Sequence, residues 1–571
     1  MKIALAQMNP TVGDYAANVR AMLQTAAAAA RQGARLVVFP ELAVCGYPPK
    51  DLIESSDFLQ AAQSAADELT EASGRPGMPA MLFGCPLQSS KRPGKLAKNV
   101  AILCDRGRVL LEQQKMLLPF YDVFDEQRYF EPGTEQHLIE LDGEVLAITI
   151  CEDAWNDKDF WPERWYENDP VDRLMQQRMP DGRRPQLILN LSASPYWEGK
   201  EAVRREMLAA VARRHNVAVA ISNQVGGNDS LIFDGGSFAL RCDGELAAQA
   251  ETFATGLAFF DSTCDQPALV PNAEADIAQD WQALVLGTRD YLHKTGFTQA
   301  LVGLSGGIDS ALVAAITVEA LGPDNVMGIG MPSEYSSSHS IDDARELAAN
   351  LGIRFELLPI RAGVDAMTTT LDPVFHGTPF GLAEENVQSR LRGVLLMAVS
   401  NKLGHLVLTT GNKSEMATGY CTLYGDMAGA LAVIGDVWKT RVYQLARYAN
   451  RNGTVIPENT ITKPPSAELR PGQLDTDSLP PYEVLDPLLQ AYVERYESAD
   501  EIASTQHLDP ALVERVLRLV QRSEYKRQQA APVLKITRKS FGTGRRFPLA
   551  ATFSNTTEST PRIAREVPVS A

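Results

Sequence analysis

Residues 303–310 read Gly-Leu-Ser-Gly-Gly-Ile-Asp-Ser and bring together groups that can bind phosphate. The hydroxyls of Ser305 and Ser310 can donate hydrogen bonds, and two adjacent glycines let the backbone approach a ligand closely. Apolar residues at helical spacing in 311–321 place Ser310 near a helix N-terminus, where unpaired N–H groups and the helix dipole attract anions. The apolar stretch 298–304 suits a buried parallel strand. The pattern therefore predicts a phosphate-binding loop between a strand and a helix.

The loop lacks the lysine that follows the glycines in a Walker motif. Its pattern Ser-Gly-Gly-x-Asp-Ser resembles the pyrophosphate loop of the ATP pyrophosphatases, which split ATP into AMP and pyrophosphate. This resemblance implies that Asp309 binds Mg²⁺ beside the phosphates, because a hard cation prefers carboxylate oxygen. The alternative is an ordinary strand–turn–helix with a polar turn.

The first half of the chain places three reactive groups at the ends of predicted strands. Glu41, Lys115 and Cys151 each stand at, or just after, the end of an apolar stretch. Catalytic groups collect at strand ends in α/β proteins. Taken singly, each has an ordinary explanation, since a cysteine there commonly fills the core and a lone glutamate or lysine is usually solvated. Together they offer a carboxylate, an amine and a thiol.

The local contexts Phe-Pro-Glu-Leu, Lys-x-x-Leu-Pro and Ile-Cys-Glu-Asp resemble the Glu-Lys-Cys triad of the nitrilase (carbon–nitrogen hydrolase) superfamily over residues 1–261. In that chemistry Glu41 takes the thiol proton as Cys151 attacks an amide carbonyl. Lys115 and the backbone N–H after Cys151 hold the negative charge of the tetrahedral intermediate. Ammonia leaves, and Glu41 then activates the water that releases the thioester.

Glutamine-using members of the superfamily suggest further contacts. The resemblance implies that Tyr121, Ser194 and Lys200 bind glutamine and that Glu126 is a helper carboxylate. Lys200 also begins a charged helical stretch (200–214), so a surface position is the alternative for this residue.

Motifs of the second half match, in order, the synthetase domain of NAD synthetases. They are 305–310, Asn386-x-Gln388-x-Arg390, 410–415 (Thr-Gly-Asn-Lys-Ser-Glu), 424–426 (Tyr-Gly-Asp), Lys439, 464–469 (Pro-Pro-Ser-Ala-Glu-Leu) and 524–527 (Glu-Tyr-Lys-Arg). With the nitrilase-like half in front, the whole chain resembles the glutamine-dependent NAD synthetases. Such an enzyme adenylates the nicotinate carboxylate of deamido-NAD with ATP and lets ammonia displace AMP.

The resemblance also assigns residues to ligands. It implies that Asp309 and Glu415 bind Mg²⁺, and that Asn386, Glu415 and Lys526 face deamido-NAD. Leu423 and Ala430 stand where the ammonia-only relatives usually have Lys and Asp, and Lys526 can compensate for that loss. The residues implied for ATP are Gly303, Leu304, Ser305, Gly306, Gly307, Ile308, Asp309, Ser310, Thr410, Lys439 and Ser466.

Composition limits the classes of function. Of 571 residues, 45% are apolar, and the formal net charge is −17, which disfavours nucleic acid as a partner because phosphate backbones need a basic footprint. The sequence contains no apolar run of membrane-spanning length. Its seven cysteines are scattered and odd in number, and its seven histidines show no metal-ligand spacing. We therefore expect a cytoplasmic enzyme with reduced thiols and small-molecule substrates.

Two α/β domains are predicted. The nitrilase resemblance implies an α-β-β-α sandwich over 1–261, and a stretch rich in proline and acids predicts a linker at 262–279. Strands alternate with helices over 298–359, which predicts a doubly wound, Rossmann-like parallel sheet in a second domain, 280–571. The related enzymes form homo-oligomers through helices of this sheet domain, so the resemblance implies the same here.

Two other functions fit part of the pattern. One is a different glutamine-dependent amidotransferase with the same pyrophosphate loop, and the other is an amidase whose second domain senses adenine nucleotides. A sensor has no need of Mg²⁺ ligands or of contacts to a second substrate. The basic segment 535–546 is predicted to be a solvated or intersubunit tail, although it could also meet the dinucleotide pyrophosphate. Residues after about 552 are expected to be poorly ordered.

Overall fold

The computed structural model describes residues 1–91, 93–262, 267–270 and 276–551. The chain divides into two compact units, Met1–Glu274 and Ala275–Ala571, and each is described by itself. Among the described residues, no helix is both long and apolar enough to cross a membrane.

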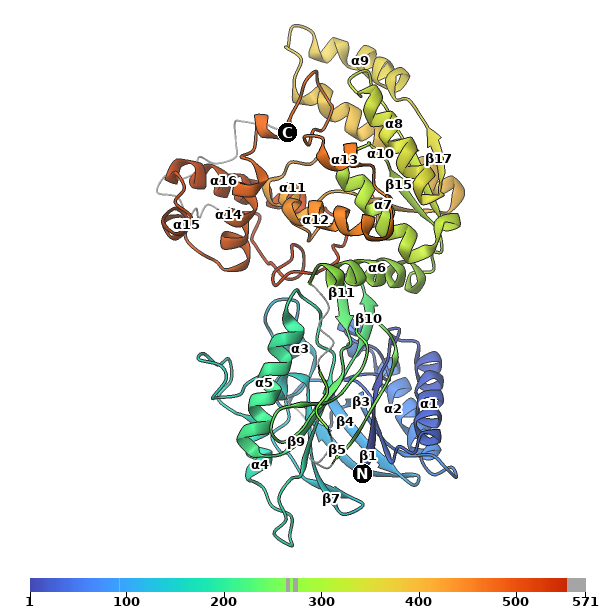
Figure 1. The fold of residues 1–571 in the computed structure, drawn as a ribbon, viewed down its shortest axis with the longest axis vertical. Helices are drawn as coiled ribbons and strands as arrows, with labels where there is room; N and C mark the ends of the chain where they lie inside the picture. The colour runs from blue at the N-terminus through green and yellow to red at the C-terminus, as the bar shows by residue number, and fades with distance from the viewer. Residues whose placement is uncertain (92, 263–266, 271–275, 552–571) are drawn as a thin grey trace. The chain divides into compact units, whose positions relative to one another are not determined.

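Two sheets form the centre of the first unit (Figure 1). In its described residues the strand orders are β14-β1-β2-β3-β4-β5 and β13-β12-β9-β8-β7-β6, and β10 and β11 form a separate hairpin. The bounds are β1 Lys2–Gln7, β2 Leu36–Val38, β3 Ala80–Gln88, β4 Ala97–Asp105, β5 Arg108–Gln114, β6 Ile139–Leu141, β7 Glu144–Ile150, β8 Leu187–Ser192, β9 Ala218–Asn223, β10 Val225–Asn228, β11 Leu231–Asp234, β12 Phe238–Leu240, β13 Leu246–Gln249 and β14 Gly256–Asp261.

Helices cover the outer faces of both sheets. The period of two along β1 sends Ile3 and Leu5 into the apolar layer between the sheets, and sends Ala4 and Ala6 into the layer under α1 and α2. A third apolar layer joins α5 to the second sheet. The order α-β-β-α follows, as the nitrilase resemblance implied. The bounds are α1 Tyr15–Arg31, α2 Ser56–Ala72, α3 Glu126–Tyr129, α4 Pro170–Gln176 and α5 Lys200–His215.

Parallel strands form the sheet of the second unit. In its described residues the order is β17-β16-β15-β18-β19, with every pair parallel. From β15 the chain continues to β16 and β17 on one side of the sheet, and then crosses to β18 on the other side of β15. The change of direction at β15 is the topological switch point, where doubly wound sheets bind ligands. The predicted Rossmann-like sheet is confirmed. The bounds are β15 Ala300–Gly303, β16 Val326–Gly330, β17 Arg354–Leu357, β18 Leu406–Thr409 and β19 Leu431–Ala432.

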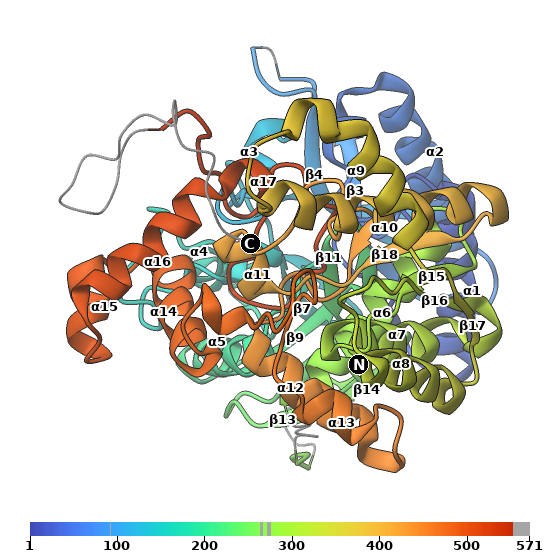
Figure 2. The same ribbon diagram turned by 90° about the horizontal axis from the view of Figure 1, so that it is seen from above.

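Helices α6, α7 and α12 pack together, and α10 packs on β15 and β18 with α9 lying along it (Figure 2). The helices α14, α15 and α16 form an apolar cluster with α11. The bounds are α6 Asp276–Lys294, α7 Ile308–Leu321, α8 Ser338–Leu351, α9 Arg361–Phe375, α10 Leu382–Leu403, α11 Lys413–Thr418, α12 Lys439–Ala449, α13 Glu458–Thr462, α14 Tyr482–Glu494, α15 Ala499–Thr505, α16 Pro510–Arg522 and α17 Glu524–Arg527.

The structure adds detail to one sequence prediction and corrects another. Helix α6 begins at Asp276, so the last four residues of the predicted linker are helical, because α6 buries an apolar face that includes Trp281 and Leu284. The basic segment 535–546 is not a solvated tail. Two of its basic residues, Lys535 and Arg545, are buried, and its Phe541 belongs to the apolar cluster of α14 and α16. The expectation for residues after 552 lies outside the described residues.

Candidate active sites

The first candidate site lies where strands of both sheets of the first unit end. Glu41 follows β2, Lys115 follows β5, and Cys151 follows β7. The Lys115 ammonium donates to Glu41 Oε1 at 2.6 Å and to both oxygens of Glu126 at 2.9 Å. Glu41 also accepts from Asn99 Nδ2 at 2.8 Å. The structure thus brings the predicted base, cation and helper carboxylate into one buried cluster.

Cys151 has a strained backbone and a defined side-chain partner. Its φ of 41° lies in the left-handed region, which residues other than glycine rarely occupy. Ser192 Oγ lies 3.4 Å from its sulfur and can donate to it. Burial, helped by the negative charge of Glu41, raises the pKa of the Cys151 thiol to about 12. At neutral pH the resting side chain is therefore a thiol, and a base must take its proton.

The charged groups around the thiol shift one another's pKa. Burial alone would lower the pKa of Lys115, but Glu126 and Glu41 raise it well above its ordinary value, so this amine is an ammonium. Burial raises the pKa of Glu126 to about 7, although Lys115 opposes the shift. Such a cluster can accept one proton near neutral pH without leaving a bare buried charge.

Asp153 holds the turn that carries the thiol. Its carboxylate accepts from the backbone N–H groups of Ile150 at 3.1 Å, Met116 at 3.0 Å and Leu117 at 2.9 Å. These bonds tie the Cys151 turn to the segment after Lys115. Sequence reasoning quoted Asp153 only as part of a motif and missed this role.

Among the residues expected to bind glutamine, Tyr121 donates to both oxygens of Glu152 at 3.0 Å. Tyr166 donates to the same carboxylate at 3.2 Å. Burial raises the pKa of Glu152, while Lys115, the two tyrosines and Lys200 oppose the shift. Glu152 was not predicted as a site residue, and its only sequence signal is its place beside the nucleophile.

Lys200 and Ser194 are both buried. The Lys200 ammonium donates to the carbonyl of Pro195 at 2.8 Å and lies 5.5 Å from the centre of the Trp155 ring. The alternative of a solvated surface lysine is therefore wrong. Ser194 donates its backbone N–H to Asn223 at 2.9 Å, and the preceding N–H, of Ala193, reaches Glu41 Oε2 at 3.2 Å.

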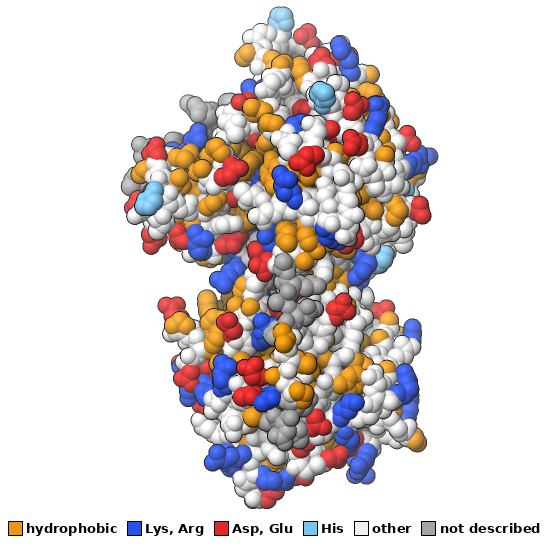
Figure 3. All heavy atoms as spheres, in the orientation of Figure 1, with side chains coloured by type: hydrophobic (Ala, Val, Ile, Leu, Met, Phe, Trp, Pro, Cys, Tyr) orange, Lys and Arg blue, Asp and Glu red, His pale blue; other side chains and the backbone are white. Residues whose placement is uncertain are grey.

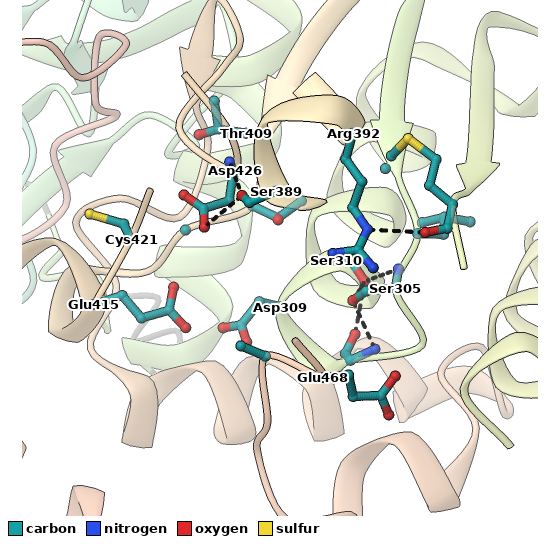
Figure 4. A pocket seen from close by; sticks show the side chains of 18 of the residues that line it. Ser305, Asp309, Ser310, Ser389, Arg392, Thr409, Glu415, Cys421, Asp426 and Glu468 are labelled. Carbon is teal, nitrogen blue, oxygen red and sulfur yellow. Dashed lines mark hydrogen bonds between the residues drawn. The ribbon is translucent and has the colours of Figure 1, made fainter. Parts of the chain in front are cut away.

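The second candidate site is a cavity of about 290 Å³ in the second unit (Figure 4). It lies over the carboxyl ends of β15, β16 and β18. The predicted residues that line it are Gly303, Leu304, Ser305, Gly307, Ile308, Asp309, Ser310, Thr410, Glu415, Lys439 and Ser466. Those that do not are Gly306, Asn386 and Lys526. Asp426 and Glu468, which belong to two of the quoted motifs, also line the cavity. Lining residues outside those motifs include Ser340, Ser389, Arg392, Lys463 and Asp475.

Backbone geometry explains the glycine of the phosphate loop. Gly306 has a φ of +77°, and a Cβ built there would lie 2.2 Å from the backbone oxygen of Ser340. The loop turns on itself, because Ser310 Oγ donates to Gly307 O at 3.0 Å and Gly307 N donates to Ser305 Oγ at 3.2 Å. Helix α7 begins at Ile308, so its first N–H groups lie beside these hydroxyls.

Two carboxylates and a lysine form the charged floor of the cavity. Lys439 forms an ion pair with Asp309, and its nitrogen lies 3.8 Å from Glu415. Asn412 Nδ2 donates to Asp309 at 3.0 Å. Burial, together with the charge of Asp309, raises the pKa of Glu415 well above its ordinary value. A second cation would relieve this repulsion, so the pair suits a divalent ion.

No group of three or more His, Cys, Asp or Glu side chains among the described residues could enclose a metal by itself. A cation bound by Asp309 and Glu415 would therefore need oxygens from substrate or water. This is the usual pattern for Mg²⁺, which is held by one or two carboxylates together with phosphates.

Asn386 and Lys526 hold the cavity wall and do not line it. Asn386 accepts from Thr422 Oγ1 at 2.8 Å, and Lys526 donates to the carbonyls of Gly419 and Cys421 at 2.7 Å each. Leu423 and Ala430 belong to the same segment and contribute backbone carbonyls as hydrogen-bond acceptors. Leu423 O accepts from Arg390, and Ala430 O accepts from Tyr291.

Comparisons with known proteins identify a family for each half of the chain. Residues 2–265 match the carbon-nitrogen hydrolase family and residues 280–530 match the NAD synthase family. A glutamine-dependent NAD(+) synthetase of Synechocystis is 48% identical over 96% of this chain and 99% of its own length. The Thermotoga maritima protein of the same name is 41% identical over 97% and 99%. A solved structure of the Acinetobacter baumannii glutamine-dependent NAD+ synthetase with ADP superposes with a TM-score of 0.74 at 40% identity, covering 96% and 98%.

Proposed function

The chain belongs to the glutamine-dependent NAD(+) synthetases, and from this premise we propose how its residues divide the reaction. As a member of the family it is a C–N ligase that uses ATP as co-substrate and takes nitrogen from glutamine. The full-length similarity supports this function over an amidase with a sensing domain or an amidotransferase for another product. We assign glutamine hydrolysis to residues 1–261, the linker to 262–279 and NAD synthesis to 280–571, so that α6 begins within the linker.

Cys151, Glu41 and Lys115 are proposed to hydrolyse glutamine. As the Cys151 sulfur attacks the side-chain amide carbon, its proton passes to Glu41. Lys115 and the backbone N–H after Cys151 stabilise the oxyanion, and the amide nitrogen leaves as ammonia after taking a proton from Glu41. Water, deprotonated by Glu41, then splits the thioester to give glutamate and restores the thiol. Glu126 keeps Lys115 charged throughout.

Tyr121, Ser194 and Lys200 are proposed to bind the glutamine substrate. The Tyr121 hydroxyl is fixed by Glu152, and Ser194 is joined to the catalytic base through the neighbouring N–H of Ala193. Lys200 supplies a buried cation beside these groups. A zwitterionic amino acid needs both a cation and an anion for recognition, and this region offers both.

The cavity of the second unit is proposed to bind ATP and deamido-NAD. The loop 303–310 holds the triphosphate, with Thr410, Lys439 and Ser466 as further ATP contacts. The nicotinate carboxylate attacks the α-phosphorus and releases pyrophosphate, and ammonia then attacks the acyl adenylate and releases AMP. Asp309 and Glu415 are proposed to hold Mg²⁺, which would neutralise charge on the phosphates.

Asn386, Glu415 and Lys526 are proposed to face deamido-NAD. For Asn386 and Lys526 the support is indirect, because both fix the segment between α11 and β19, whose Tyr420, Cys421 and Gly425 line the cavity. Rearrangement of that wall on binding would release their polar groups to the dinucleotide.

We propose that two copies associate through α9 and α10. No described residue of α9 is buried, and Val374, Phe380 and Val394 of this helix pair and its connection are 76%, 57% and 63% exposed. A second copy of the same face would cover these side chains. Light scattering is expected to give an oligomer for the wild type and a smaller particle for Val394→Glu.

We also propose a cytoplasmic enzyme with small-molecule substrates. Each cysteine that the structure describes is a free thiol, and five of these six are buried, which suits a reducing compartment. Cys264 lies outside the described residues. Acidic and basic side chains are intermixed over the face in Figure 3, as expected when small molecules are the partners.

The observation that carries the proposal is the buried Lys115–Glu41–Glu126 cluster beside Cys151 in a chain that also holds a phosphate-loop cavity. The test is incubation with glutamine, ATP, Mg²⁺ and deamido-NAD, with NAD, AMP, pyrophosphate and glutamate as products. Omission of ATP is expected to leave glutamate and ammonia as the only products. NAD formed without AMP would contradict the adenylation step.

A further inference from the structure

The cavity of the second unit contains an arginine that sequence reasoning did not single out. Arg392 lies on α10, and Ser389, Gly393 and Leu396 of the same helix also line the cavity. In Figure 4 its guanidinium points toward the side of the cavity where Ser305 and Ser310 lie.

One hydrogen bond fixes the orientation of Arg392. Its Nε donates to the carbonyl of Met331 at 3.0 Å, directly after β16. The phosphate loop starts at the same sheet edge, where Leu304 N donates to Ile329 O at 2.8 Å. Met331 uses one of the five N–H groups of the guanidinium. The two terminal nitrogens make no hydrogen bond to any residue that the structure describes, so four N–H donors are left for a ligand.

Arg392 also lacks a close carboxylate. No acidic side chain within the described residues comes within 4.0 Å of its guanidinium, whereas Arg527 lies 2.9 Å from Glu524 and Arg441 lies 2.6 Å from Asp280. Burial lowers the pKa of Arg392, and Glu468 and Asp426 only partly offset this effect from a distance.

Both of those carboxylates have other partners. Glu468 accepts from Ser340 Oγ at 2.6 Å, and Asp426 accepts from Thr422 N at 2.8 Å. A partly buried cation without a paired anion is costly, so a bound anion would stabilise it.

The other cations of the cavity are already committed to protein carboxylates. Lys439 is paired with Asp309, and Lys463 donates to Ser340 at 2.8 Å and lies 4.0 Å from Asp343 and from Glu468. Carboxylates outnumber cations among the described lining residues, which makes a triphosphate hard to hold without further positive charge. The acids are Asp309, Glu415, Asp426, Glu468 and Asp475, and the bases are Arg392, Lys439 and Lys463.

We propose that Arg392 binds a phosphate oxygen of ATP through its terminal guanidinium nitrogens. This inference rests on the proposed use of the cavity as the ATP site. Deamido-NAD also carries phosphates, but the guanidinium is anchored at the sheet edge where the pyrophosphate loop begins, and this favours ATP. Arginine suits the role because its planar fork matches two phosphate oxygens at once.

The test measures calorimetric binding of α,β-methylene-ATP, adenosine and deamido-NAD to the full-length enzyme and its variants. Arg392→Met is expected to weaken α,β-methylene-ATP binding about tenfold or more, while adenosine and deamido-NAD bind as before. Arg392→Lys keeps the charge and the aliphatic stem and is expected to lose less affinity. Lys402→Met removes an exposed charge from the same helix and is expected to change none of the three affinities.

Each other outcome overturns the assignment. If Arg392→Met weakened deamido-NAD binding and left the ATP analogue unaffected, the arginine would serve the dinucleotide. Equal weakening of adenosine and α,β-methylene-ATP would indicate a structural role. Unchanged binding in every variant would remove Arg392 from the site. If the wild type itself failed to bind the ATP analogue, the ATP site proposed for this cavity would fall with it, and that failure is distinguishable from the others.

Discussion

The two sites treat buried charge in opposite ways. In the first, Lys115 lies between Glu41 and Glu126 at hydrogen-bond distance, and the groups satisfy one another before any substrate arrives. In the second, Glu415 is crowded by Asp309, and no acidic side chain that the structure describes lies within 4.0 Å of the Arg392 guanidinium. The first site therefore pairs its lysine within the protein, whereas the second leaves a cation and two crowded carboxylates for its ligands.

This difference follows from the two reactions. Amide hydrolysis by a thiol needs a base and an oxyanion stabiliser at fixed positions, which a closed network supplies. Transfer of an adenylyl group involves highly charged substrates, and a cavity with unbalanced charge can bind them and their metal ion. Mutations that affect one site and leave the other intact test this difference.

The largest effect is expected for Cys151→Ala. Because the thiol belongs only to the first site, glutamine-dependent NAD formation should fall at least on the order of 10³-fold. Synthesis from added ammonium salts should continue at the wild-type rate. The readout is NAD production with each nitrogen source, and glutamine-driven synthesis near the wild-type rate would exclude Cys151 as the nucleophile.

Asp309→Asn is expected to damage both nitrogen pathways. It removes a negative charge from the pair that is proposed to hold Mg²⁺ and breaks the ion pair with Lys439. Pyrophosphate release should fall on the order of 10²-fold with either glutamine or ammonium. Asp324→Asn, on the short turn after α7, is the matched control. Unchanged release at limiting Mg²⁺ would remove Asp309 from the metal site.

The residues changed in these two experiments, Cys151 and Asp309, were both predicted from the sequence. The triad and the phosphate loop lie at strand ends, and short motifs with defined spacing identify such positions. The first strands and α1 were predictable because apolar periodicity and the Asp14 cap are local signals, and Asp14 does accept from Ala17 N at 3.1 Å. Helices α2 and α9 were not predicted, although α2 has the same kind of local start, with Ser55 Oγ accepting from Phe58 N at 3.4 Å.

Hydrogen-bond partners that are distant in the sequence could not be predicted. Glu152 and Asp153 stand beside Cys151, but their roles depend on Tyr121 and on the backbone of Met116, which approach only after the sheets pack. The basic segment after 535 looked solvated because its charges are numerous. In the structure, the apolar residues Val533 and Leu534 are buried, and the adjacent Lys535 is buried as well.

The closed network of the first site can be tested through pH. Burial raises the pKa of the Cys151 thiol to about 12, so the thiolate fraction should rise about tenfold per pH unit between pH 7 and pH 9. Alkylation of Cys151 by iodoacetamide without glutamine is expected to accelerate accordingly, with no plateau in this range. Mass spectrometry of the modified peptide measures the rate, and the Cys151→Ala variant corrects for other thiols. A plateau below pH 8 would show a thiolate already stabilised in the resting enzyme.

The smallest effect is expected for Tyr121→Phe, which removes only the hydroxyl held by Glu152. One hydrogen bond contributes about 1 kcal/mol, so the KM for glutamine should rise roughly three- to tenfold. The KM values for ATP and deamido-NAD, measured with ammonium, should not change. A raised KM for either nucleotide would show that the two sites do not separate as their charges suggest.

Nitrogen released at Cys151 should become the carboxamide nitrogen of NAD. Mass spectrometry of NAD made from glutamine labelled with ¹⁵N in its side-chain amide tests this most directly. NAD made by the wild type should be one mass unit heavier, and NAD made by Cys151→Ala from the same glutamine and ordinary ammonium should be unlabelled. Labelled NAD from Cys151→Ala, or unlabelled NAD from the wild type without added ammonium, would contradict it.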